Sequence, residues 1–555
     1  MHREYPDQQA GAHSSNITAV IADGVAIMVE MTDILVVGAG MAGLTAAAYA
    51  AKAGRAVTVC ERAEKVGGLV TDFSEQGFHF DAGLRAVENS GVVQPMLRDL
   101  GLQVAFLPNP VTIRVQDRQL RLDRDGLAEY GALLTGLFPH NASDIRAIVR
   151  EIERVMAIMD VLYGIDNPLF LDIKNDPAYL IHTLLPWLLR YRRNMRKVEK
   201  LQQPIETYLA RFTSNQALID TIAQHFFRNT PSFFALSYFG LYQDYQYPQG
   251  GTGALPIAMA EFIRANHGKV LCNTGIVKID PVARVAATEA GNALHYQAMV
   301  WACDHKALHK AVAEDSFRSK SWSDQAERIA HARGGDSVLT VFLALDLPPA
   351  EVERAFGAHC FYTPSTEGLS SLGLNRWQEA ADTTERLEAM TAWVIRYLTL
   401  TTFEISCPVL RDSTLAPQNQ CGLIVSTLFS YDLTLAFGQR GGSEALKSLC
   451  VETITDLLAA AMPAVRGKVL YASCATPLTL EKYTGNTDGA ITGWAFTGTI
   501  PAEARFAKIA HSVRTPLPHV YQAGQWSFSP SGLPVSIITG KLAADAALKS
   551  LGRKK

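Results

Sequence analysis

The sequence lacks the features that identify several large classes of protein. Its formal net charge is only −3 at pH 7, so no excess of one charge favours nucleic acid or a strongly charged partner. No hydrophobic run reaches the roughly 18 to 20 residues that cross a bilayer as a helix. The fourteen histidines are not paired at metal-ligand spacing, and an HExxH motif is absent. The sequence therefore predicts neither a nucleic-acid partner nor a metal site.

Cysteine motifs are equally scarce. The eight cysteines form no CxxC pair and lie scattered along the 555 residues. Disulfide-rich secreted domains and zinc ribbons both need closely spaced cysteines. The pattern indicates reduced, mostly buried thiols in a cytosolic protein.

The composition indicates a large globular core. Hydrophobic residues make up 48% of the chain and charged residues 19%, which is too apolar for a disordered protein. A length of 555 residues suggests two or more domains. Residues 1–30 fit this picture poorly, because their one apolar stretch is broken by Asp23 and Gly24. We expect residues 1–30 to be a disordered leader, or Met31 to be the natural start.

A complete strand–helix–strand unit begins at Asp33. Residues 33–37 (DILVV) and 56–60 (AVTVC) are short apolar runs, as strands buried on both faces should be. Between them, GAGMAG leads into an alanine-rich segment that favours a helix and stops at Gly54. Glu61 stands directly after the second strand.

Gly38, Gly40 and Gly43 form the pattern G-x-G-x-x-G at the strand-to-helix turn. The first glycine permits the tight turn, the second lets the backbone approach a pyrophosphate, and the third lets helix and strand pack closely. The helix N-terminus offers free N–H groups to the phosphates. Glu61 can accept a hydrogen bond from a ribose 2′-OH, and its charge disfavours the 2′-phosphate of NADP. These residues predict a dinucleotide site, with an unliganded unit of the same shape as the alternative.

Four further segments indicate which dinucleotide to expect. The glycine pair 67–68 follows Glu61 by six residues, and GFHFDAG (77–83), LRDSTLAP (410–417) and ATPLTLEKYTGNTDGAITG (475–493) come later. In this order they resemble segments of the superfamily of FAD-dependent amine oxidases and phytoene desaturases, along nearly the whole chain after Met31. The resemblance implies FAD as cofactor. It also implies an α/β fold in which a Rossmann-type FAD-binding domain is interleaved with an α+β substrate domain.

The resemblance also implies how the chain divides. The FAD-binding domain would be discontinuous, with residues 31–105, 250–310 and 505–555, and residues 106–249 and 311–504 would form the substrate-binding domain. The FAD-binding domain would close on YQAGQWSFSPSGLPVSIITG (521–540), where a late strand returns and a helix begins near Leu533. The N-terminus of that helix would point at the flavin ring and stabilise negative charge on reduced flavin. An ordinary amphipathic closing helix is the alternative.

Cofactor contacts are implied for seven parts of the chain: the glycine-rich loop, the end of the second strand, the glycine pair, the end of GFHFDAG, and three later stretches. In that order, these residues are Gly38, Ala39, Gly40, Met41, Ala42 and Gly43; Glu61 and Arg62; Gly67, Gly68 and Leu69; Gly83, Leu84 and Arg85; and Ile276, Gly524, Gln525, Leu533, Pro534 and Val535.

Two positions depart from the family pattern. Gln525 stands where the family often has Asp, and Leu69 stands where many desaturases and amine oxidases have Arg. In lacking this cation, the sequence resembles the carotenoid isomerases and retinol saturases more than the classical desaturases. The direction of the redox chemistry is therefore left open. The sequence contains no catalytic triad. Arg85 and Glu88 are candidates for contacting cofactor or substrate, and a simple ion pair between them at i, i+3 is the alternative.

Residues 179–200 (YLIHTLLPWLLRYRRNMRKVEK) combine an apolar half with a basic half. Such a segment is too short to span a bilayer but suits peripheral contact with an anionic membrane surface. A core helix with a basic exposed end is the alternative. The aromatic stretch 225–248 could line an apolar tunnel or fill a core. The expected location is the cytoplasm, with or without peripheral membrane contact.

The resemblance implies an FAD-dependent oxidoreductase that acts on C=C or C–C bonds of a long apolar substrate. The substrate would be carotenoid-, retinoid- or unsaturated acyl-like, and the reaction a desaturation, a saturation or a cis–trans isomerisation. A flavin amine oxidase that produces hydrogen peroxide is one alternative, and a lipid-binding flavoprotein without turnover is another. Substrate identity, electron acceptor and oligomeric state are left open.

Overall fold

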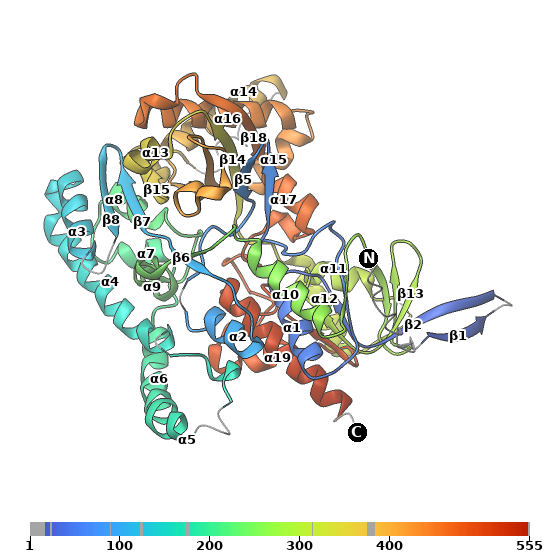
Figure 1. Ribbon diagram of the computed structural model, residues 1–555. Helices are drawn as coiled ribbons and strands as arrows, with labels where there is room; N and C mark the ends of the chain where they lie inside the picture. The colour runs from blue at the N-terminus through green and yellow to red at the C-terminus, as the bar shows by residue number, and fades with distance from the viewer. Residues whose placement is uncertain are drawn as a thin grey trace, which may run out of the picture.

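The computed structural model describes residues 17–22, 25–88, 90–122, 126–163, 165–172, 177–313, 315–373 and 383–552. Two large β-sheets, set apart from each other, organise these residues, and helices cover both sheets (Figure 1). Within these ranges, every helix is too short or too polar to cross a membrane.

The first sheet contains the predicted strand–helix–strand unit. Its strands run in the order β10–β3–β2–β13–β12–β11, with β1 paired to β2 and β19 paired to β13. Residues 34–37 in the middle of this sheet are fully buried, because helices or loops cover both faces. The strands are β1 (Ile17–Ala22), β2 (Val25–Val37), β3 (Val57–Cys60), β10 (Lys269–Leu271), β11 (Ile276–Asp280), β12 (Val285–Thr288), β13 (Ala293–Trp301) and β19 (Val520–Gln522).

Two sets of helices cover the first sheet. One face is covered by α1 (Met41–Lys52), α2 (Val93–Leu100), α10 (Ala254–Ala265) and α19 (Leu533–Leu551). The other face packs against α11 (His305–Ala311) and α12 (Lys320–His331). The late strand β19 lies parallel to β13, so the C-terminal segment returns to this sheet.

The second sheet runs in the order β18–β14–β17–β16–β15–β7–β8. Its neighbours are antiparallel except for β15 and β7. One face packs against α13 (Pro349–Phe356), α14 (Thr383–Leu400), α15 (Tyr431–Gly438) and α16 (Ser443–Ala461). The strands are β7 (Val111–Val115), β8 (Arg118–Leu122), β14 (Ser337–Leu345), β15 (His359–Thr363), β16 (Phe403–Ser406), β17 (Cys421–Phe429) and β18 (Val469–Ala475).

A helical region flanks the second sheet. It contains α3 (Gly126–Leu137), α4 (Ala142–Tyr163), α7 (Ile205–Leu209), α8 (Gln216–Ala223) and α9 (Ser232–Leu241), which share one apolar core. The short α5 (Pro177–Tyr179), a π-helical turn over Leu180–Leu184 and α6 (Leu185–Val198) project away from the body at the lower left of Figure 1.

Two short antiparallel strand pairs form separate small sheets. β4 (Asp72–Glu75) pairs with β5 (Phe78–Asp81), and their phenylalanines pack against Phe342 of the second sheet. β6 (Phe106–Pro108) pairs with β9 (Gln246–Pro248). The helices α17 (Pro477–Thr484) and α18 (Ile509–Ser512) complete the C-terminal part.

The prediction of a disordered leader is wrong for part of residues 1–30. β1 and the first half of β2 form an antiparallel pair, from Ile17 opposite Glu30 to Ala22 opposite Val25. Glu30 also lies in register with Leu294 of β13. The β-branched and apolar residues of this stretch favour extended backbone, which explains the strands. Residues 1–16 and 23–24 lie outside the described residues.

The predicted reduced thiols are confirmed. All eight cysteines lie in the described part of the chain as thiols, five of them buried and three half-buried. Burial raises the pKa of the Cys303 thiol, so this side chain stays protonated at neutral pH.

Candidate functional site

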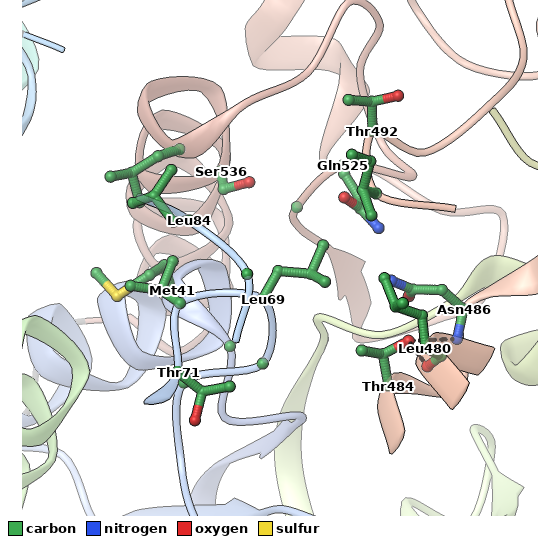
Figure 2. Close-up of a pocket in the computed structure, with 18 of the residues that line it drawn as sticks. Met41, Leu69, Thr71, Leu84, Leu480, Thr484, Asn486, Thr492, Gln525 and Ser536 are labelled. Carbon is green, nitrogen blue, oxygen red and sulfur yellow. Dashed lines mark hydrogen bonds between the residues drawn. The ribbon is translucent and has the colours of Figure 1, made fainter. Parts of the chain in front are cut away.

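A cavity of about 1060 Å³ is lined by loops of the first sheet, by β16 and β17 of the second sheet, and by the helical region. Cavities for single drug-sized ligands are usually about 300 to 1,000 Å³, so this one has room for a dinucleotide with a second ligand beside it. Figure 2 shows Leu69 near the middle, with Met41 and Leu84 on one side and Asn486 and Gln525 on the other.

Most residues that the sequence predicts as cofactor contacts line this cavity. Ala39, Gly43, Pro534 and Val535 do not, so the structure gives no support for direct contacts from these four. Those that do are Gly38, Gly40, Met41, Ala42, Glu61, Arg62, Gly67, Gly68, Leu69, Gly83, Leu84, Arg85, Ile276, Gly524, Gln525 and Leu533.

The glycine-rich loop has the shape that a phosphate group requires. Gly38 has a φ of +97°, and a Cβ there would lie 2.4 Å from the sulfur of Cys303. A Cβ on Gly43 would lie 1.9 Å from the carbonyl oxygen of Gly38, so this glycine serves helix-to-strand packing. A Cβ on Gly40 would meet no protein atom within 4 Å. The space above Gly40 is therefore open to a ligand, at the N-terminus of α1.

The Glu61 carboxylate fixes the glycine-rich loop by hydrogen bonds to backbone N–H groups. Its Oε2 accepts a hydrogen bond from the Ala39 N–H at 2.7 Å, and its Oε1 accepts one from the Ala63 N–H at 2.8 Å. Each carboxylate oxygen has a second lone pair that can accept a ribose hydroxyl. Ala39 thus has a backbone role in the site, although its side chain does not line the cavity.

The glycine pair lies directly against this loop. The Gly67 N–H donates to the Ala39 carbonyl at 2.8 Å, and Gly67 and Gly40 form an isolated bridge. Gly67 has a φ of +123° and Gly68 a φ of +60°, conformations that glycine adopts without strain. Leu69 then faces the cavity, where an Arg would have brought a positive charge.

The C-terminal segment closes the cavity as predicted for its position in the chain. Leu533 and Ser536 of α19 line the cavity, because residues three apart share one face of a helix. Pro534 and Val535 fall on other faces of the same turn. The Gly524 N–H donates to the Thr539 hydroxyl at 2.9 Å, which fixes the strand end to the helix. The N-terminus of α19 therefore borders the cavity.

The two later segments that carry the family resemblance differ in their position relative to the cavity. Residues of 475–493 line the cavity, including Leu480, Thr484, Asn486 and Thr492, although no single one of them could be named from the sequence. Residues 410–417 do not line the cavity. Asp412 instead accepts the Gly250 N–H at 2.9 Å, which ties this segment to the loop before α10.

Arg85 forms an ion pair with a residue that sequence reasoning missed. Its Nη1 lies 3.3 Å from Oε2 of Glu404 on β16, and its Nη2 donates to the Ser426 hydroxyl on β17 at 2.6 Å. His359 places Nε2 3.0 Å from the other oxygen of Glu404. The alternative pairing of Arg85 with Glu88 is therefore wrong, because the guanidinium turns to the second sheet.

Two carboxyl groups of the cavity differ in their proton affinity. Burial alone would raise the pKa of Glu404, but Arg85 and His359 lower it to about 2. The Glu404 side chain keeps 32% exposure, and Glu404 lines the cavity. Burial raises the pKa of Glu88 to about 7. At neutral pH, Glu404 is therefore ionised, while Glu88 is close to half protonated.

An aromatic arm extends the cavity into the helical region. It is lined by Phe226, Phe227, Phe234, Tyr238, Tyr242, Tyr245 and Phe361. The rings of Tyr242 and Tyr245 are 5.4 Å apart, and those of Tyr242 and Phe361 are 5.0 Å apart. The arm contains His225, whose pKa burial lowers to about 4, so its ring is neutral. Hydrocarbon fits this wall better than an ion does.

A family model for flavin-containing amine oxidoreductases matches residues 41–406, most of the chain. The chain belongs to this family. Its cofactor is therefore FAD, and it is an FAD-dependent oxidoreductase, as predicted. The glycine loop, the Glu61 carboxylate and the open space above Gly40 fit the cofactor.

Relatives of the chain include retinol reductases, a phytoene dehydrogenase and L-amino acid oxidases by name. An all-trans-retinol 13,14-reductase of Danio rerio is 22% identical over 89% of this chain and 82% of that protein. An inactive all-trans-retinol 13,14-reductase of the same organism is 28% identical, over 47% of this chain and 43% of that protein. A phytoene dehydrogenase of Streptomyces griseus is 29% identical over 41% of this chain and 45% of that protein. The predicted resemblance is confirmed.

Solved structures confirm the predicted fold class. A crystal structure of an oxidoreductase from Methanosarcina mazei has a TM-score of 0.59 at 14% identity, covering 93% of this chain and 100% of that one. Putrescine oxidase bound to putrescine has a TM-score of 0.57 at 13% identity, covering 93% of this chain and 98% of that one. At such identities the likeness concerns the fold alone.

Substituting Gly40 tests the cofactor site without disturbing the fold. In Gly40→Ala, we expect FAD to bind at least about tenfold more weakly, a loss of about 1.4 kcal/mol, because the new methyl group enters open space. The thermal stability of the FAD-free protein should not change. Gly43→Ala is the matched control, since its Cβ would strike the Gly38 carbonyl and lower stability even without FAD. Unchanged FAD fluorescence titration of Gly40→Ala would place the phosphates elsewhere.

Proposed function

We propose that this enzyme oxidises, reduces or isomerises carbon–carbon bonds of a long, polyene-like substrate. The aromatic arm carries the proposal, because it joins the space beside the glycine loop in one cavity. A long hydrocarbon that enters the arm would bury apolar surface, which is the main source of affinity for such ligands. Retinol and phytoene, named in the relatives, are both polyenes, which supports this substrate class.

Glu88 is the residue of this chain that would take part in the proton transfer, and Glu404 would have a structural role beside it. FAD, when bound, accepts or supplies a hydride at a substrate carbon. Glu88 would take or give the accompanying proton, since a pKa of about 7 suits either task near neutral pH. Glu404 would stay ionised and paired with Arg85, and this pair would fix the guanidinium in the wall of the cavity. The aromatic side chains would hold the chain in place and exclude water.

The amine oxidase hypothesis has less support. A substrate ammonium needs a carboxylate with charge to spare, but Arg85 already neutralises Glu404. Leu69 makes the middle of the cavity apolar (Figure 2). The likeness to putrescine oxidase lies in the fold, at 13% identity. A binding protein without turnover is disfavoured because the family that the chain matches is one of oxidoreductases.

The flavin itself reports which substrate class reacts. FAD-loaded enzyme should be mixed without oxygen with a retinoid or carotenoid and, separately, with a primary amine. If the reaction is an oxidation or a reduction, we expect polyenes to change the visible absorbance of the flavin and amines to leave it unchanged. An isomerisation leaves the flavin spectrum unchanged and is recognised from the altered polyene. Reduction of the flavin by the amine alone would support the amine oxidase hypothesis instead.

A further inference from the structure

The projecting part of the helical region carries apolar side chains that folding does not bury. α6 already has an inward face, formed by Trp187, Tyr191, Asn194 and Val198 at helical spacing. The Trp187 indole N–H donates to the Val161 carbonyl of α4, and this bond orients the helix. Outside that face, five large apolar side chains are exposed: Leu180 by 45%, Ile181 by 55%, Leu185 by 57%, Leu188 by 41% and Leu189 by 68%.

A basic stretch follows directly along the same helix. Its six exposed cations are opposed by one acidic residue, Glu199. They are Arg190, Arg192, Arg193, Arg196, Lys197 and Lys200. The whole chain has a net charge of −3, so this positively charged cluster differs in sign from the chain as a whole. The apolar residues therefore lie at the far end of the projection, and the cations lie between them and the body (Figure 1).

The dimensions suit one leaflet of a bilayer. Residues 180–189 make ten positions, which span about 15 Å at 1.5 Å per helical residue. That is about half of the roughly 30 Å hydrocarbon core, and it exceeds the 5 to 10 Å to which interfacial helices are usually buried. Cations at the polar side of such a segment lie at the level of lipid headgroups, where each contributes about a fivefold gain in binding to anionic membranes.

We propose that residues 179–200 dock on an anionic lipid bilayer, with the exposed leucines in the acyl region of one leaflet and the cations on the phosphates. The exposure of these leucines argues against the core-helix alternative for the outer face of α6, whose inner face packs on the helical region. A second copy of the chain is a poorer occupant, because self-association would bring two clusters of six cations together.

Docking would bring the aromatic arm towards the lipid. α6 packs against α4, and α4 packs against α9, whose Phe234 and Tyr238 line the arm. A long apolar substrate dissolved in the bilayer would then reach the cavity without crossing water. Binding to lipid does not rest on the proposed reaction, so the two proposals fail separately.

Vesicle co-sedimentation of the FAD-loaded protein tests the docking surface. The probes are phosphatidylcholine vesicles with and without phosphatidylglycerol. We expect at least tenfold tighter binding to the anionic vesicles, and a loss of that difference at high salt. Leu185→Ser with Leu189→Ser should weaken binding at least about tenfold. Replacing Arg190, Arg192, Arg193 and Arg196 with Gln should weaken binding to anionic vesicles at low salt more than about a hundredfold.

The matched control is Val469→Ser with Leu470→Ser, an exposed apolar pair on β18 that should not affect vesicle binding. Each variant should keep the flavin spectrum and the melting temperature of the wild-type protein. Wild-type protein that does not sediment, or a leucine variant that binds as the β18 control does, would overturn the proposal. So would light scattering that shows the leucine variant to be a monomer and the wild-type protein a dimer.

Discussion

Replacing Glu88 with Gln should lower kcat on a polyene by a hundredfold or more, while FAD binding stays intact. The amide cannot exchange a proton, and a positioned acid or base typically contributes 10² to 10⁴ in rate. Steady-state turnover of Glu88→Gln measures the loss. Glu129→Gln, on the exposed surface of α3, is the control and should leave kcat unchanged. A kcat within threefold of wild type would remove Glu88 from the chemistry.

The pH dependence of kcat distinguishes desaturation from saturation of the substrate. Glu88 has a pKa of about 7, so kcat of the wild-type enzyme should change through that pH and the inflection should vanish in Glu88→Gln. Desaturation releases a proton to the carboxylate, and its kcat should rise with pH. Saturation consumes a proton from the carboxylic acid, and its kcat should fall with pH.

The free energy of unfolding should also depend on pH through Glu88, and the direction of that dependence follows from its pKa. The pKa of Glu88 rises from its ordinary value of 4.5 in the unfolded chain to about 7 in the folded protein, because the folded protein buries the carboxyl group. Below pH 4.5 the carboxyl is protonated in both states and has no effect on stability. Between pH 4.5 and 7 the unfolded state ionises first, so the free energy of unfolding falls as pH rises, by up to about 3 kcal/mol. Glu88→Gln should lack this fall.

Breaking the ion pair of the cavity wall should cost about 3 kcal/mol of stability. Arg85→Met leaves the Glu404 carboxylate beside His359 without its cation, and uncompensated buried charges are expensive. The free energy of unfolding by urea measures this cost. The double variant Arg85→Met with Glu404→Met should recover most of it, because no charge is left unpaired.

An exposed ion pair provides the matched control. Arg98 pairs with Asp166 at the surface, where both side chains are largely accessible to water. Arg98→Met should therefore lower stability by less than about 1 kcal/mol. Equal losses for Arg85→Met and Arg98→Met would mean that water in the cavity screens the Arg85–Glu404 pair fully.

The parts of the site that lie close together in the sequence were predictable. The G-x-G-x-x-G turn, Glu61 and the glycine pair lie within about thirty residues of each other, and their spacing reflects backbone geometry that few sequences satisfy. The C-terminal strand and helix were recognisable because glycines and a proline mark their ends. These local patterns predicted the cofactor and the fold class.

Contacts between distant segments were not predictable. Glu404 and Ser426 are separated from Arg85 by 319 and 341 residues, and each stands in an ordinary strand pattern. From the sequence alone, Glu88 was the nearer partner for Arg85. The β1–β2 pair was missed for a related reason, since Asp23 and Gly24 indicated an interruption rather than the place between two strands.

In the aromatic stretch, the orientation of α9 determines which aromatic side chains line the cavity and which lie in the core. Phe234 and Tyr238 are four residues apart on one face of α9 and line the cavity. Phe233 and Phe239 lie on other faces and are fully buried in the core. The sequence left a tunnel and a core as alternatives, and the structure contains both, because a helix that is apolar all round has two neighbours to cover.

Product analysis after anaerobic incubation tests the central claim most directly. FAD-loaded enzyme, oxidised or chemically reduced, is incubated with a retinoid or carotenoid. The products are separated by chromatography, and their masses are measured by mass spectrometry. The account predicts a product that differs by two hydrogens, or an isomer of unchanged mass. A polyene that stays unaltered while an amine is deaminated and the oxidised flavin becomes reduced would contradict it.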